Sequence, residues 1–147
     1  MAMDASASGL ASVRTKLNFN LNNPWSFVFA IDAGNSPTLA NNGTISIINN
    51  ATPAPITTYV TFTDTSATFS IAGNTKTIGL TMGGGSFTWR RFSFGVSTVT
   101  NTATWSLDGV VQHSASYAVA QVHLYLTEQG GGLTLFDNLL ITFSTAP

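Results

Sequence analysis

Apolar and polar residues alternate with a period of two along most of this chain. The segment Trp25 to Asp32 is an example, because Trp25, Phe27, Phe29 and Ile31 occupy every second position. Alternation of this kind is typical of strands that bury one face, and no segment keeps the helical period of about 3.6 residues. The pattern therefore predicts an all-β protein in which helix is almost absent.

About eleven short strands are predicted from this alternation and from the turn residues between the runs. They cover residues 16–21, 25–32, 44–48, 57–63, 67–72, 76–82, 88–97, 103–107, 110–113, 121–127 and 135–143. Gly73-Asn74 and Asp108-Gly109 suit tight antiparallel hairpins, since type I′ turns need positive φ at both central residues. Eleven strands are too many for an ordinary open sheet, so we expect a two-sheet antiparallel β-sandwich.

The first thirteen residues differ from the rest of the chain, because small and polar residues dominate them and Asp4 is their one charge. They lack the basic start and apolar run of a signal peptide, so no cleaved leader is predicted. No window approaches the roughly 18 consecutive apolar residues of a membrane span. We interpret residues 1–13 as an N-terminal arm that packs on a neighbouring subunit, and residues 14–147 as one sandwich domain.

Charge is scarce in this chain. Charged residues make up 7% of the 147, and five basic against six acidic residues give a net charge of −1. Such a surface offers no field for phosphates, so we predict no nucleic-acid partner. The absence of cysteine excludes disulfides and thiolate sites. Asn, Thr and Ser supply 49 residues, and this neutral polar surface is of the kind found in adhesins, fibres and virion shells.

Four segments, in this order, carry a resemblance to a known fold family. They are WSFVFAID (25–32), FTWRRFSFGV (87–96), TWSLDGVV (104–111) and FDNLLI (136–141). Together they resemble the concanavalin A-like jelly roll, especially its laminin-G-like branch of lectin and adhesion modules. The resemblance implies a lectin-type sandwich, and in many members of the family a calcium ion lies beside the glycan.

Catalysis is not expected from the residues at hand. The family includes endoglucanases, and glycoside hydrolysis of that kind needs two carboxylates on either side of the scissile bond. This chain has one glutamate, Glu128, and no cluster of carboxylates on one strand. It also lacks the Gly-x-Ser-x-Gly elbow of serine hydrolases. We therefore expect the chain not to be an enzyme.

No metal site and no cofactor are predicted. His113 and His123 fall on different strands, and no cysteine is available to complete a zinc shell. Calcium needs several converging oxygens, which Asp32 with Asn35, or Asp64 with backbone carbonyls, could begin to supply. The six acidic residues are dispersed, so calcium is not expected either.

A sugar site needs an aromatic platform together with polar groups that bind hydroxyls. Alternation places Arg91, His123 and Tyr125 on the outside of their strands, and Tyr59 on the outside of its own. These four residues are the candidate ligand-binding site. Their alternative role is in a protein interface, because Arg and Tyr are enriched in such contacts.

Two functions remain open at this point. The first is a non-catalytic structural or adhesion protein, a bacteriophage surface decoration or fibre subunit that displays a lectin-like domain in a symmetric homo-oligomer. Its partners would be other copies of the chain, neighbouring virion proteins and cell-surface glycans. The protein would lie at the virion surface or outside the cell, and it would not insert into a membrane. The alternative is a free-standing carbohydrate-binding lectin module.

Overall fold

The computed structural model describes residues 2–4, 10–14, 19–20, 25–35, 42–49, 56–81, 88–97, 99–117, 121–129 and 133–145. These residues form thirteen strands and no helix, which confirms the all-β prediction. The strands are β1 (Ala2–Asp4), β2 (Leu10–Arg14), β3 (Phe19–Asn20), β4 (Trp25–Asn35), β5 (Asn42–Asn49), β6 (Ile56–Phe62), β7 (Ser66–Ile71), β8 (Asn74–Gly79), β9 (Thr88–Ser97), β10 (Thr102–Leu107), β11 (Val110–Ser116), β12 (Gln121–Gln129) and β13 (Leu133–Thr145). Across these ranges there is accordingly no helix of the length and hydropathy that crossing a membrane requires.

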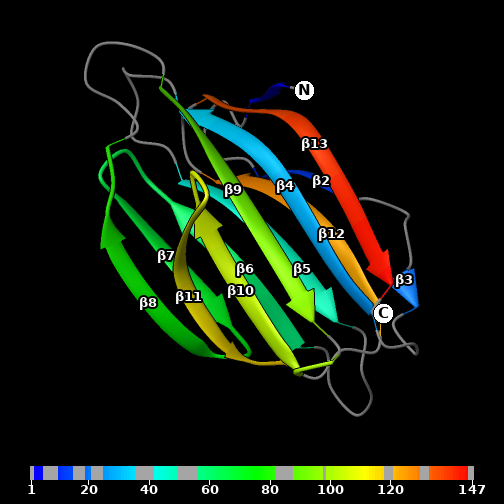
Figure 1. The fold of residues 1–147 in the computed structure, drawn as a ribbon. Helices are drawn as coiled ribbons and strands as arrows, with labels where there is room; N and C mark the ends of the chain where they lie inside the picture. Colours follow the sequence, from blue (N-terminus) through cyan, green and yellow to red (C-terminus); the bar gives the residue numbers. More distant parts are fainter. Residues whose placement is uncertain are drawn as a thin grey trace.

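The strands form two sheets that pack face to face (Figure 1). The six-stranded sheet has the order β1-β13-β4-β9-β10-β11, and the seven-stranded sheet has the order β2-β12-β5-β6-β7-β8, with β3 also paired to β12. Every pairing is antiparallel, for example β4 with β9 and β5 with β6. The predicted two-sheet sandwich is confirmed.

The N-terminal segment supplies one strand to each sheet. β1 pairs with β13, and β2 pairs with β12. β1 and all of β2 except Arg14 fall within residues 1–13, the predicted arm, so the described part of that segment extends this chain's own sheets. A contact between residues 1–13 and a second subunit stays a prediction.

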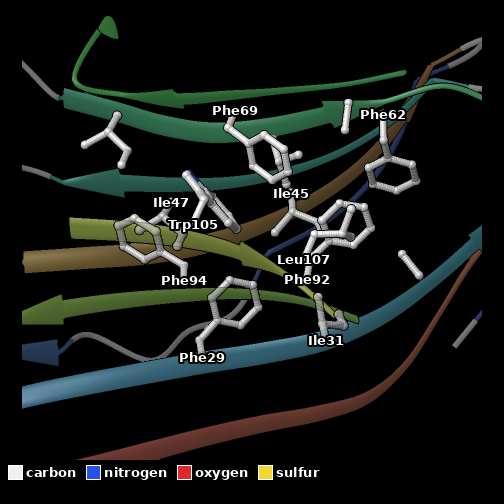
Figure 2. Close-up of a cluster of buried hydrophobic side chains, with 14 of the residues drawn as sticks. Phe29, Ile31, Ile45, Ile47, Phe62, Phe69, Phe92, Phe94, Trp105 and Leu107 are labelled. Carbon is white, nitrogen blue, oxygen red and sulfur yellow. The ribbon is translucent and has the colours of Figure 1, made fainter. Parts of the chain in front are cut away.

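The core lies between the sheets, and among the described residues its strand members are alternate residues of β4, β5, β6, β7, β9, β10 and β13 (Figure 2). Trp105 on β10 is fully buried, and its ring centroid lies 4.8 Å from that of Phe94 and 6.2 Å from that of Phe69. Its indole Nε1 donates a hydrogen bond to the carbonyl oxygen of Ser70 at 3.2 Å. Because Trp105 belongs to one sheet and Ser70 to the other, this side chain joins the two layers by packing and by a hydrogen bond.

Two hairpin turns show how the local sequence sets the register. Asp108 and Gly109 have φ of 50° and 81°, which confirms the predicted type I′ turn between β10 and β11. The turn between β7 and β8 is one residue earlier than predicted, because Ala72 and Gly73 take the positive φ values of 48° and 84°. Asn74 therefore starts β8, opposite Ile71.

Candidate functional site

Threonine hydroxyls form a row across the outer face of the seven-stranded sheet. Thr44, Thr61, Thr68 and Thr77 are direct cross-strand partners on β5, β6, β7 and β8. Their neighbours Ile45, Val60 and Phe69 are buried, so alternation turns the threonines away from the core. The hydroxyls of Thr44 and Thr61 lie 3.3 Å apart, and those of Thr68 and Thr77 lie 2.8 Å apart. We call this set the threonine row.

A second row lies beside the threonine row on the same face. Ser46, Tyr59, Ser70 and Thr75 are cross-strand partners on the same four strands. Tyr59 is half-buried, whereas Ser70 is covered and 1% exposed. The second row thus adds an aromatic ring to a face that otherwise carries hydroxyls.

The register continues both rows onto β12 and β2. Thr127 lies opposite Thr44 and Ser12, and Tyr125 lies opposite Ser46 and Arg14. His123 is two positions from Tyr125 on β12, opposite Ile48. Since direct antiparallel partners share a face of the sheet, the register brings three predicted site residues, Tyr59, His123 and Tyr125, to one face.

Arg14 is a residue that the sequence analysis missed. It is the first residue of the predicted sandwich domain and precedes the first predicted strand, and only the pairing of β2 with β12 places it opposite Tyr125. The threonine row was also missed, although its signal is present in the sequence as threonine at alternate positions of the predicted strands.

Arg91, the fourth predicted site residue, lies on the other sheet. It is on β9, and its guanidinium donates to a carboxylate oxygen of Asp32 at 2.8 Å. The second oxygen of Asp32 accepts a hydrogen bond from the side-chain amide of Asn138, also at 2.8 Å. The structure therefore does not bring Arg91 together with Tyr59, His123 and Tyr125.

Asn138 reaches Asp32 because β13 contains a bulge. The register between β13 and β4 shifts between Asp137 and Leu140, and Asn138 takes a φ of 52° there. Asp32, the first of the calcium candidates, is thus a structural acceptor with both oxygens engaged. Over the described ranges, no three Asp, Glu or His residues converge as a metal site.

His113 also has a structural contact. Its Nε2 lies 3.0 Å from the carbonyl oxygen of Asn74, which links β11 of the six-stranded sheet to the start of β8 in the seven-stranded sheet. The two histidines of the chain therefore belong to different sheets, since His123 is on β12.

Within the described parts of β5 to β8, the threonine row and the second row carry no charged side chain. Lys76 on β8 is the cross-strand partner of the core residue Phe69, so it belongs to the opposite face of the sheet from the two rows. Such a face presents hydroxyl groups and an aromatic ring, and at its β12 and β2 side it continues through the positions of Tyr125, His123 and Arg14. The described positions of this face include no pair of carboxylates of the kind that glycoside hydrolysis needs.

No protein-family model matches this chain, and no curated protein matches its sequence. Solved structures do match. An endo-1,3-β-glucanase from Streptomyces sioyaensis has a TM-score of 0.71 at 9% identity, covering 92% of this chain and 70% of its own. The carbohydrate recognition domain of Emp46p, in a mutant form, has a TM-score of 0.70 at 6% identity, with coverage of 97% and 80%. The alginate lyase AlyC3, in complex with dimannuronate, has a TM-score of 0.65 at 11% identity, with coverage of 99% and 74%.

These likenesses show that the chain has the concanavalin-like jelly-roll fold, as the sequence resemblance implied. They also correct the expectation that the chain is not an enzyme. Glucanases, alginate lyases and a transglycosylase share this fold at similar TM-scores, beside a lectin domain. The missing pair of carboxylates argued against one reaction, and enzymes with this fold are not limited to that reaction.

Proposed function

We propose that this jelly-roll domain binds a polysaccharide across the outer face of its seven-stranded sheet. The observation that carries the proposal is the register. It places Tyr59, Tyr125, His123 and Arg14 on one face together with two rows of hydroxyls. The carbohydrate-acting and carbohydrate-recognising proteins that share the fold support the same ligand class.

The chemistry of this face suits sugars. A hydroxyl group both donates and accepts hydrogen bonds, so threonine and serine side chains match the hydroxyls of a sugar without a fixed polarity. An aromatic ring such as Tyr59 covers the apolar face of a pyranose. Binding sites of this kind combine an apolar surface with a few polar groups that fix orientation.

Titration calorimetry against laminarin, alginate and a mannose-rich glycan tests the proposal. We expect at least one of these to bind, and Tyr59→Ala to weaken that binding about tenfold, which is about 1.4 kcal/mol. The matched control is Trp89→Ala, because Trp89 is an aromatic residue on β9 of the other sheet and is 45% exposed. Absence of binding to all three glycans, or an equal loss in both variants, contradicts the proposal.

A second function, cleavage of a bound uronate polymer by elimination, is favoured by the pairing of Arg14 with Tyr125 and the nearby position of His123. A guanidinium can hold a uronate carboxylate in a bidentate pair, and an imidazole and a phenol can act as base and acid. The base removes the proton at C5, the bond from C4 to the leaving sugar oxygen breaks, a C4–C5 double bond forms, and the acid protonates that oxygen. Appearance of ultraviolet absorbance from the unsaturated product of alginate, lost in His123→Ala, tests this activity. A flat absorbance trace contradicts it.

Display on a virion surface or outside the cell, in a homo-oligomer with neighbouring virion proteins, stays a prediction. It is supported by the neutral surface rich in Asn, Thr and Ser. Light scattering on the full chain tests the assembly. A mass of several chains supports it, and the mass of one chain contradicts it.

A further inference from the structure

We infer that the ligand is a neutral, extended polysaccharide and that it crosses the strands along the threonine row of β5 to β8. This inference rests on the proposed function and adds the substrate class and the direction of the bound chain.

The first step concerns the hydroxyl groups of the row. They are joined in two pairs, Thr44 with Thr61 and Thr68 with Thr77. In each pair one hydroxyl donates to the other, which leaves one O–H and several lone pairs directed elsewhere. The row can therefore donate to a ligand and accept from it at each pair, as sugar hydroxyls require.

The second step concerns spacing. Neighbouring strands lie about 4.8 Å apart, so side chains in one register row repeat at about that interval across the sheet. One sugar unit of an extended polysaccharide has a similar length. A chain laid along the threonine row thus meets one threonine for each sugar, whereas a chain laid along a strand meets outward side chains about 7 Å apart.

The third step concerns charge. No charged residue belongs to the described parts of the two rows between β5 and β8. A polymer of uronates would bring a carboxylate on every sugar, and desolvated carboxylates need cations or several hydrogen-bond donors. Between β5 and β8 the rows offer hydroxyls and the ring of Tyr59, which suits a polymer without charge. Arg14 continues the second row on β2, outside the part of the face to which the inference assigns the ligand.

The test uses the double variant Thr61→Val and Thr68→Val, which removes one hydroxyl from each pair. Valine has a similar shape and favours strands, so the sheet should remain intact. We expect affinity for laminarin, a neutral glucan, to fall about tenfold by titration calorimetry. The control is Thr104→Val on the outer face of the six-stranded sheet, where the Thr104 hydroxyl lies 3.2 Å from that of Ser114 in a similar pair. Melting temperatures of both variants check that the fold is kept.

Four outcomes decide the matter. Weaker laminarin binding in the double variant and unchanged binding in Thr104→Val support the inference. Stronger binding of alginate than of laminarin by the unmodified chain, or laminarin binding that needs Tyr59 and not the two threonines, overturns the inference and leaves the proposed function standing. Binding of no polysaccharide overturns both.

Discussion

The two sheets use polar residues in different ways. On the six-stranded sheet, Arg90 pairs with Asp108 at 2.8 Å, and Arg91 pairs with Asp32 at 2.8 Å. Asp108 also accepts a hydrogen bond from the backbone N–H of Arg91 at 2.9 Å. On the seven-stranded sheet, the described rows between β5 and β8 hold hydroxyls and the ring of Tyr59.

This difference concerns how the few charged residues of the chain are distributed between the two sheets. Five basic and six acidic residues are present in all, and two of each are committed to ion pairs on one sheet. Those pairs join β9 to β4 and to the hairpin of β10 and β11, so their role is to hold strands together. Between β5 and β8, the two described rows on the seven-stranded sheet carry no charged residue, and Arg14 lies beyond them on β2.

Loss of the Trp105 side chain should disturb both faces at once and have the largest effect. Trp105→Ala removes a buried ring that contacts Phe29, Phe69 and Phe94, and it removes the hydrogen bond to Ser70. We expect a loss of about 3 to 5 kcal/mol in the free energy of unfolding, measured by urea denaturation. Trp89→Ala, at an exposed position, should cost less than about 1 kcal/mol. Equal losses would mean that Trp105 does not join the sheets.

Alkaline pH should weaken the shared core through Tyr117. Burial raises the pKa of this phenol to about 12, and the nearby hydroxyl of Thr58 on β6 lowers it in part. The ring of Tyr117 meets Phe94 of the six-stranded sheet edge to face, so the phenol lies between the layers. Below pH 10, both the folded and the unfolded chain hold the phenolic proton, and the stability is fully present. As pH rises from about 10 through about 12, the unfolded chain alone releases the proton, and the free energy of unfolding falls by about 2 to 3 kcal/mol.

The matched variant for this pH dependence is Tyr117→Phe. It keeps the ring and removes the group that titrates, so its stability should change less between pH 9 and pH 12 than that of the unmodified chain. Identical pH profiles for the two proteins, by chemical denaturation, would show that another group is responsible.

Gly43→Ala should disturb the seven-stranded sheet selectively. Gly43 on β5 is buried, and a Cβ there would lie 2.3 Å from Cζ of Phe62, whose ring stacks on Phe92 with centroids 4.9 Å apart. The ring of Phe62 must shift, so the free energy of unfolding should fall by about 1 to 3 kcal/mol. Because Thr44 follows Gly43 directly, binding of laminarin should weaken as well. Gly79→Ala on β8 is the control, since no atom lies within 4 Å of the added Cβ. An unchanged free energy of unfolding in Gly43→Ala would show that the Phe62 ring moves at no cost.

The alternation of apolar and polar residues was sufficient to predict an all-β sandwich of two sheets, whereas the concanavalin-like jelly roll was implied by the resemblance of four segments. It predicted the strands that form the core, such as Thr88 to Ser97, because burial of one face leaves a period-two signal in the sequence. It did not predict β1 and β2, whose small and polar residues carry a weak signal and which are placed by pairing with β13 and β12. For the same reason Arg14 was not recognised as a neighbour of Tyr125.

The candidate site was predicted in part, because alternation decides which side of a strand a residue occupies and not which sheet the strand joins. Tyr59, His123 and Tyr125 fell on one sheet, whereas Arg91 fell on the other. Sheet order depends on pairings between strands far apart in sequence, such as β4 with β9, and local patterns do not encode these.

Replacement of Arg91 should have the smallest effect and gives the sharpest test of the contrast between the two faces. Arg91→Gln removes the ion pair with Asp32. The Arg91 side chain is 39% exposed and that of Asp32 is 21% exposed, so the free energy of unfolding should fall by about 0.2 to 1 kcal/mol, and by less at high salt. Laminarin affinity should not change, because Arg91 and the threonine row lie on different sheets. Calorimetry on this variant beside Tyr59→Ala compares the two faces directly. A tenfold loss of binding in Arg91→Gln with full affinity in Tyr59→Ala would reverse the assignment, since the charged face would then bind the ligand and the hydroxyl rows would serve only the fold.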